Sequence, residues 1–125
     1  MDTVDLERKF PELQPKVLEI ADQVLDLIMR IFPAAVVSED GDNIGFGFGS
    51  GYKELVFIIS PQSNWGNLGI VNGAVLDDPK SLMEGKGKVH RHVKLHQVEQ
   101  AQNPDLEDLM LRALQAAQKW IHQTT

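Results

Sequence analysis

The strongest constraint on the fold is the stretch of residues 34–71, in which four short apolar segments alternate with turn-forming residues. We expect strands at residues 35–39, 44–49, 53–60 and 65–71, and the sequence DGDN predicts a hairpin turn between the first two. The third segment has LVFII at its centre and is expected to be a central strand, buried on both faces. Short strands joined by short turns favour antiparallel pairing, so a mainly antiparallel sheet is predicted.

Two amphipathic helices are predicted, one before and one after this stretch. The first begins at about residue 12 or 15 and ends before Pro33, because apolar side chains recur at spacings of three and four residues. The second begins after Asn103, and its apolar stripe reaches Trp120, which we interpret as a core or dimer anchor. A single helical turn is also expected at residues 79–83, capped by Asp78.

A fifth strand, at residues 89–95, completes the predicted order of elements. The expected fold class is α+β: a mainly antiparallel sheet of about five strands, with the N-terminal and C-terminal helices packed on one of its faces. A chain of 125 residues is long enough for one compact core, so we expect a single domain spanning residues 1–125.

Composition excludes several classes of function. The formal net charge of -6 argues against generic nucleic-acid binding. The absence of cysteine excludes disulfides, thiolate metal ligands and a cysteine nucleophile. The N-terminal sequence MDTVDLERKF is unlike a signal peptide, and no run of about 18 apolar residues occurs. We therefore expect a cytoplasmic protein that binds neither nucleic acid nor membrane.

The candidate functional segment is GKGKVHRHVKL, residues 85–95. Residues 86–96 contain four lysine or arginine residues and no acid, whereas the rest of the chain is acidic on balance. Positive charge beside glycines, whose backbone N–H groups can approach a ligand closely, favours an anion, with Trp65 or Tyr52 available for stacking. The predicted ligand-binding residues are Trp65, Lys86, Lys88, His90, Arg91 and His92.

Strand alternation divides this segment into two rows. One row, facing the core, is expected to contain Arg91 together with Val89, Val93 and Leu95. The outward row would contain Lys88, His90, His92, Lys94 and His96. A buried arginine needs a partner, which is either a salt bridge to Glu84, Asp77 or Asp78 or an anion that arrives as ligand.

Known phosphate-binding and metal-binding motifs do not account for the segment. The glycine run GFGFGSG lacks the third glycine of GxGxxG, and GKGK lacks both the first glycine and the hydroxyl of the P-loop. His90 and His92 have a spacing that suits a metal ion, but the neighbouring lysines would repel one. No metal site, cofactor or catalytic residue is therefore predicted.

Residues 67–95 resemble the characteristic block of the YdhG-like domain family, also called the domain of unknown function 1801. The resemblance implies a compact α+β domain, and the family has no general established activity. Some members have been likened to frataxin-type iron chaperones, which would make the acidic helix face of Glu19, Asp22 and Asp26 the natural iron surface. The matching motifs are Asn72-Gly73, Asp78-Pro79, Glu84-Gly85-Lys86-Gly87-Lys88 and Arg91-His92-Val93-Lys94.

The leading hypothesis is a small binding or adaptor domain whose Gly85 to Lys94 segment contacts an anionic ligand or an acidic protein partner. These two occupants are equally favoured, since charge alone does not identify a partner, and a homodimer is left open. The alternatives are a frataxin-like iron-binding protein and an enzyme whose site is assembled from distant segments.

Overall fold

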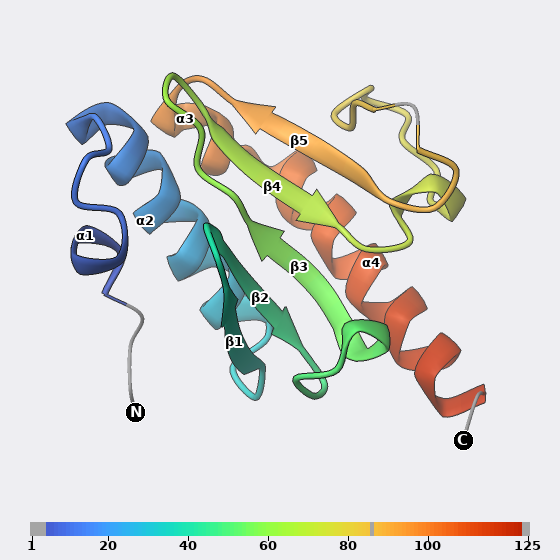
Figure 1. Ribbon diagram of the computed structural model, residues 1–125. Helices are drawn as coiled ribbons and strands as arrows, with labels where there is room; N and C mark the ends of the chain where they lie inside the picture. The colour runs from blue at the N-terminus through green and yellow to red at the C-terminus, as the bar shows by residue number, and fades with distance from the viewer. Residues whose placement is uncertain (1–4, 86, 124–125) are drawn as a thin grey trace.

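The computed structural model describes residues 5–85 and 87–123, with side chains described as far as Lys119. Five strands form one antiparallel sheet against which helices pack, which confirms the predicted α+β fold (Figure 1). The strands are β1 (Val36–Asp40), β2 (Asn43–Gly47), β3 (Leu55–Ile59), β4 (Gly66–Ile70) and β5 (Arg91–Leu95). The helices are α1 (Leu6–Lys9), α2 (Pro15–Ile31), α3 (Val98–Ala101) and α4 (Pro104–Gln123), with 3-10 turns η1 (Tyr52–Glu54) and η2 (Gly73–Val75).

The strands lie in the sheet in the order in which they occur in the sequence, so each one pairs with the next. β3 is therefore the central strand, as predicted. Its register places Ile59 opposite Ile44 on one side and Leu68 on the other, and Leu68 in turn lies opposite Val93. These four side chains are almost completely buried, so they mark one apolar face of the sheet.

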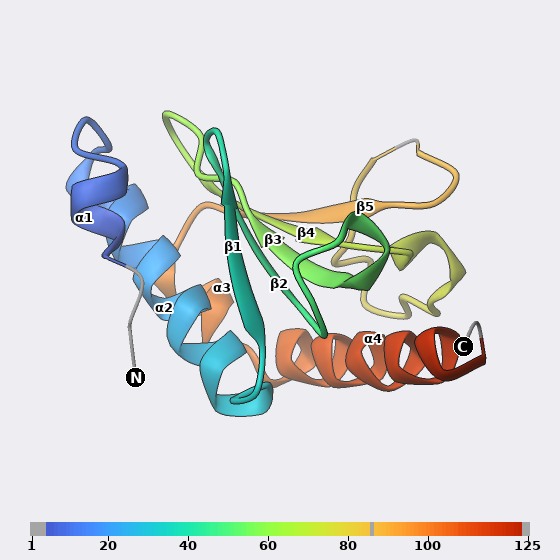
Figure 2. The same cartoon turned by 60° about the horizontal axis from the view of Figure 1, so that its bottom comes forward.

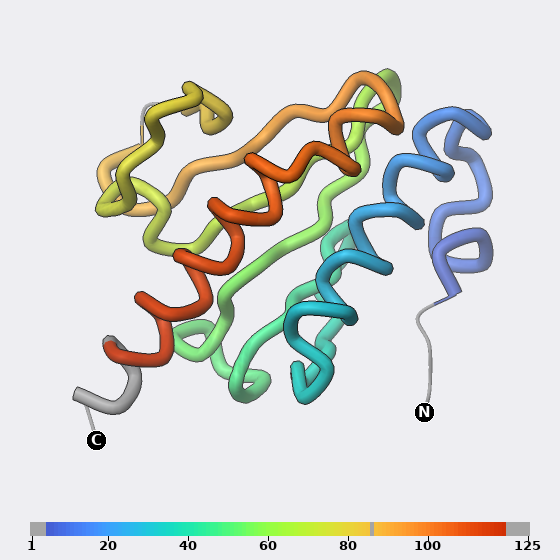
Figure 3. Tube along the Cα trace, turned by 180° about the vertical axis from the view of Figure 1, so that it is seen from behind, coloured from blue at the N-terminus to red at the C-terminus, as the bar shows by residue number. Residues whose placement is uncertain are grey.

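Helices α2 and α4 both cover this apolar face. Their buried side chains form a single hydrophobic core with those of the sheet. Figures 2 and 3 show the two helices on the same side of the sheet. Because the helices lie on that side, the outward-facing Leu55 and Ile58 of β3 are only half-buried, and the prediction that this strand is buried on both faces is wrong. The prediction for the Trp120 side chain falls outside the described residues.

Both long helices begin where the sequence predicts, and α2 also ends where it predicts. α2 has Pro15 in its first position, where a missing N–H costs nothing, and it ends before Pro33. α4 begins at Pro104, and the side chain of Asn103 accepts a hydrogen bond from the Asp105 N–H at 2.9 Å. Within the described part of the chain, no helix combines the length and the apolar character needed to cross a bilayer.

A β-bulge explains the glycine-rich sequence of β2. The register between β2 and β3 shifts between Phe46 and Gly47. At this point the backbone of Glu54 and Leu55 occupies the space where a Cβ atom of residue 47 would lie. The bulge and the close backbone approach agree with the bare strand face that the alternating glycines predict.

The structure departs from the predicted elements mainly around the candidate segment. Strand β5 begins at Arg91 rather than at Val89, which lies outside the strand with 49% of its surface exposed instead of facing the core. Residues 79–83 form irregular turns instead of a helix, and helices η2 and α3 were not expected.

Candidate functional site

A connector, residues 71–90, leads from β4 to β5 and folds back along the outer edge of β5. The Asp78 carboxylate accepts hydrogen bonds from the N–H groups of Leu82 and Met83, at 2.9 and 2.8 Å, which replaces the expected helical cap. Further along, Glu84 and His92 exchange two backbone hydrogen bonds, at 2.6 and 3.1 Å. The connector is thus attached to the strand that contains the candidate residues.

Arg91 is half-buried and lacks a carboxylate partner among the described residues. It lies opposite Ile70 in the register and shares the apolar face with Val93 and Leu95, as predicted. Its guanidinium makes one long hydrogen bond, 3.4 Å from Nη1 to the carbonyl oxygen of His90, and no ion pair within the part of the chain that the structure describes. The predicted salt bridge to an acid of the connector is therefore not formed.

None of the three acids expected to pair with Arg91 forms an ion pair with it among the described residues. Asp78 is engaged by backbone N–H groups, as described above. Asp77 is exposed, and its backbone carbonyl oxygen accepts a hydrogen bond from Arg112 of α4 at 2.7 Å. Glu84 is exposed and contributes its backbone to the edge of β5. Among the described residues, the Arg91 guanidinium, which has five N–H donors, therefore has one hydrogen-bond acceptor.

Two glycines of the connector lie close to this arginine. A Cβ atom at Gly87 would lie 3.8 Å from Nη1 of Arg91 and 2.9 Å from the carbonyl oxygen of His90. Gly85 has a φ of +117°, a conformation that other residues rarely adopt, and a Cβ there would lie 3.3 Å from the His92 ring. The glycines therefore allow the connector to pass close to Arg91. Lys86, which lies between them, is outside the described residues.

His90 is held by two hydrogen bonds from separate parts of the chain. Its Nδ1 accepts the backbone N–H of Asn72 at 3.1 Å, and its Nε2 lies 2.7 Å from the hydroxyl oxygen of Tyr52. A backbone N–H can only donate, so the ring proton of the neutral imidazole is on Nε2, which donates to Tyr52. The two rings meet edge to face, with centroids 5.8 Å apart. This arrangement fixes the position of the connector just before β5.

The structure places Trp65 at the opposite end of β5 from His90 and Arg91. Trp65 precedes Gly66, which lies opposite Leu95, whereas Arg91 lies opposite Ile70 at the other end of the same pair of strands. The aromatic ring of Trp65 has Lys94 Nζ 5.0 Å above its centroid and the His96 ring 6.2 Å away. Tyr52, not Trp65, is therefore the aromatic neighbour of His90.

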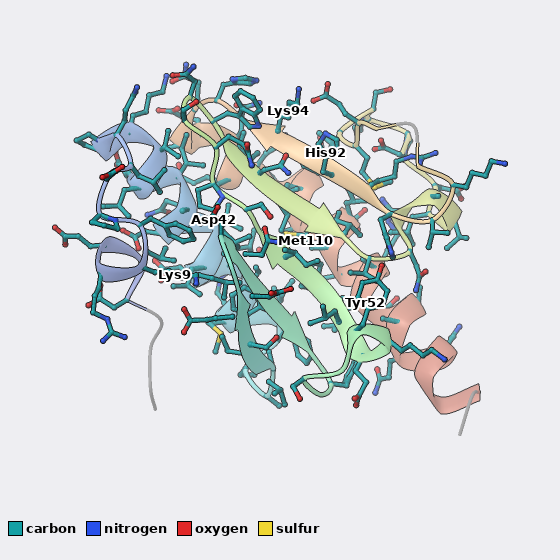
Figure 4. The ribbon with its side chains drawn as sticks, in the orientation of Figure 1. Lys9, Asp42, Tyr52, His92, Lys94 and Met110 are labelled. Carbon is teal, nitrogen blue, oxygen red and sulfur yellow. The ribbon has the colours of Figure 1, made fainter. Side chains whose placement is uncertain are left out.

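The remaining predicted residues lie between these two ends or on the surface beside them. His92 and Lys94 are half-buried on the outward face of β5, opposite Gly69 and Asn67 (Figure 4). Lys88 is exposed on the connector. Lys88, His90 and Arg91 thus follow one another closely along the chain where the connector enters β5, and His92 lies on the other face of the strand from Arg91.

Two cavities border the segment, and neither is lined by Arg91 or His92 in the part of the chain described. The first, of about 300 Å³, lies between the connector and α4, and Lys88 and Val89 form part of its wall. The second, of about 250 Å³, lies along the outer edge of β5, between Glu84 and the start of α4. A cleft containing Arg91 or His92 beside a carboxylate of shifted pKa would favour an enzyme, and neither of these two cavities has that lining among the described residues.

The acidic face of α2 is the only other charged cluster that the sequence singled out. Glu19, Asp22 and Asp26 are exposed, and partial burial, followed by the charges of Asp26, Glu7 and Asp5, raises the pKa of Asp22 above its usual value. Among residues 5–85 and 87–119, no three histidine or acidic side chains are placed so that they could hold a metal ion. The structure adds no support to the iron hypothesis.

Sequence reasoning named Tyr52 only as an alternative to Trp65, and it missed Asn72 as the residue that holds His90. The Asn72-Gly73 pair was a usable signal, because asparagine tolerates the left-handed conformation that Asn72 adopts, with a φ of 61°. The pairing with His90, 18 residues later, could not be read from that local signal.

Comparison with known proteins identifies no relative: no protein-family model, curated protein or solved structure matches this chain.

Proposed function

We propose that this protein is a small binding domain whose Gly85 to Lys94 segment contacts an anionic ligand or an acidic protein partner. The observation that supports the proposal is Arg91, a half-buried guanidinium without a carboxylate partner among the described residues. Charged groups that are removed from water are normally paired, and an arginine kept free of internal acids is suited to an anion from outside. Membership of the YdhG-like family stays a prediction from sequence.

The surroundings of Arg91 favour the same ligand class. Lys88 adds a second exposed cation on the same connector, and the fixed position of His90 holds the chain between them. Arginine binds carboxylate and phosphate oxygens with two parallel N–H groups, whereas lysine acts as a single charge. The proposed roles are thus distinct: Arg91 orients the anion and Lys88 adds charge attraction at the surface.

Titration with inorganic pyrophosphate, followed by amide chemical shifts in the segment and by calorimetry, tests the ligand form of the proposal. We expect saturable shifts at Gly85, Gly87 and His92 in the wild-type protein. Replacing Arg91→Gln should weaken binding about tenfold, because a hydrogen bond to a charged group contributes about 1.5–3 kcal/mol and the half-exposed site reduces that value. Arg91→Lys keeps the charge but not the paired N–H donors, so its affinity for pyrophosphate should lie between those of the wild-type protein and Arg91→Gln.

Arg8→Gln is the matched control, since Arg8 is an exposed arginine of α1 on a different part of the molecule. It should leave pyrophosphate binding unchanged. Equal weakening by Arg8→Gln and Arg91→Gln would show that only the net charge matters, and the Arg91 site would be refuted. Absence of binding by the wild-type protein would remove the ligand form.

The acidic-partner form is tested with a glutamate-rich peptide and by sedimentation at low and high salt. Binding that depends on Arg91 and weakens with salt would support a protein partner. A homodimer that joins this segment to the acidic face of α2 would dissociate in both Arg91→Gln and Asp22→Asn. Monomers at low salt, without peptide binding, would exclude this form.

A further inference from the structure

The cavity between the connector and α4 has the features of a binding site for a small apolar molecule. Its volume is about 300 Å³, at the lower end of the range for ligand pockets. That is about twice the volume of an apolar cavity that holds one benzene molecule, so it has room for about a dozen carbon atoms. The cavity is lined by Val71, Asn72, Val75, Leu76, Lys88, Val89, Ala113, Ala116 and Ala117.

The walls of the cavity come from two elements that approach without filling the space between them. On the part of α4 whose side chains are described, those at the cavity are three alanines, which leave room beside the helix. On the connector, a hydrogen bond of 2.9 Å from the Ala74 N–H to the Val89 carbonyl joins the two stretches that form the opposite wall. The His90 bonds to Asn72 and Tyr52 hold the same wall in place. The cavity is therefore bounded by well-connected backbone on both sides.

Apolar side chains at the mouth of the cavity are unusually exposed. Val75 has 76% of its surface exposed and Val89 has 49%, although both line the cavity. Valine is one of the residue types most often found inside proteins. Covering these two side chains with an apolar ligand would remove them from water, which is favourable in proportion to the area covered.

The charge at the cavity determines the kind of ligand. Among the described residues that line the cavity, Lys88 is the one with a charge, and none is acidic. Asn72 is the other polar residue, so an ammonium and a carboxamide face an otherwise apolar space. A neutral hydrocarbon would leave the lysine without a partner, and a cation would be repelled.

We infer that this cavity binds a small amphipathic anion, with an apolar body of about a dozen carbon atoms or fewer between the connector and α4 and its anionic head group at Lys88. The inference rests on the proposed function, since Lys88 belongs to the same segment, and it names the chemical class of the ligand. The head group would lie on the connector and the apolar body would cover Val75 and Val89.

Octanoate is the probe for this site, and two related molecules separate its features. Octylammonium has the same chain with the opposite charge, and acetate has the charge without the chain. We expect octanoate to bind, measured by calorimetry and by methyl shifts of Ala113, Ala116 and Ala117, and acetate to cause no saturable shifts there. Octylammonium should bind more weakly than octanoate. Equal binding of octanoate and octylammonium would refute the anionic part of the inference.

Variants locate the binding in the cavity. Ala117→Leu should reduce octanoate affinity more than tenfold by filling the space, whereas Gln115→Leu adds the same side chain to an exposed position of α4 and should have no effect. Lys88→Gln should weaken the binding of octanoate about fivefold, as expected for an exposed charge pair. Lys16→Gln, an exposed lysine of α2, is the control. Thermal unfolding of each variant verifies that it is folded.

Several outcomes would overturn the inference. Failure of wild-type protein to bind octanoate, or binding that Ala117→Leu leaves unchanged, would do so. Trp120 follows Ala116 by four residues in the sequence, so Trp120→Ala is measured in parallel. Octanoate binding by Trp120→Ala, without binding by the wild-type protein, would mean that the chain fills its own cavity. Pyrophosphate binding that depends on Arg91, without octanoate binding, would leave the proposed function standing and reject only the inference drawn from the cavity.

Discussion

A methyl group at position 47 has no room in this fold, so Gly47→Ala should be strongly destabilising. The Cβ atom of an alanine would lie 2.8 Å from the carbonyl carbon of Glu54 and 2.8 Å from the Cα of Leu55. These are backbone atoms, which cannot rotate away as a side chain can. Relief therefore requires β2 and β3 to move apart at the bulge.

The size of the effect can be estimated from the contacts that would be lost. The Phe48 N–H donates to the Glu54 carbonyl oxygen at 2.9 Å, and separation of the strands would break this bond at a cost of about 1 kcal/mol. Forcing an extra carbon atom into a filled site costs about 1–3 kcal/mol. The expected loss of unfolding free energy is about 2–4 kcal/mol, a large fraction of the roughly 5–15 kcal/mol of a typical domain.

Urea unfolding followed by circular dichroism measures this loss, and Gly69→Ala is the matched control. Gly69 also lies in the sheet, but a Cβ atom there would lie 3.3 Å from the Cβ of Ile58, so we expect a cost below about 1 kcal/mol. Gly47→Ala should also disturb the contact between Tyr52 and His90, because η1 follows the bulge. If the two variants unfold at the same urea concentration, the close backbone approach at the bulge is wrong.

Three further substitutions test separate parts of the structure. Partial burial and then the charge of Asp26 raise the pKa of Asp22 above the usual 3.8, so Asp22 contributes stability at low pH that is lost as the pH rises through its folded value. Asp22→Asn should therefore stabilise the protein at neutral pH by about 0.3 kcal/mol, and this gain should disappear in acid unfolding experiments below the usual aspartate pKa. Tyr52→Phe should lower the unfolding free energy by less than about 1 kcal/mol, because the hydrogen bond to His90 is exposed. Nitrogen chemical shifts should show the neutral His90 ring protonated on Nε2 both in the wild-type protein and in this variant. A proton on Nδ1 would refute the assigned hydrogen bonds. Asp78→Ala should lower the unfolding free energy by about 1–2 kcal/mol and increase hydrogen exchange at the amides of Leu82 and Met83, which the Asp78 carboxylate binds. Unchanged exchange at these amides would show that the connector is held by other contacts.

Local patterns in the sequence were sufficient to predict the main elements. The 3.6-residue period of α2, with Pro15 at its start and Pro33 after its end, depends only on neighbouring residues. The same is true of the alternation that places Arg91 on the core side of β5. Short turns between strands also predicted antiparallel order, because strands joined in this way pair with their neighbours. These features are determined by contacts within a few residues of the chain.

The candidate site depended on pairings that no local pattern contains. In the antiparallel register of β4 and β5, Trp65 lies five residues from Ile70, the residue opposite Arg91, a distance of about 17 Å at 3.4 Å per residue. The bulge and η1 place Tyr52 beside His90. The approach of the connector to α4 forms the cavity beside Lys88. The sequence by itself determined the fold class, the two long helices and the inward direction of Arg91. The tertiary structure decided that Arg91 has no carboxylate partner among the described residues, because the Asp78 carboxylate binds backbone N–H groups and Asp77 and Glu84 are exposed to solvent.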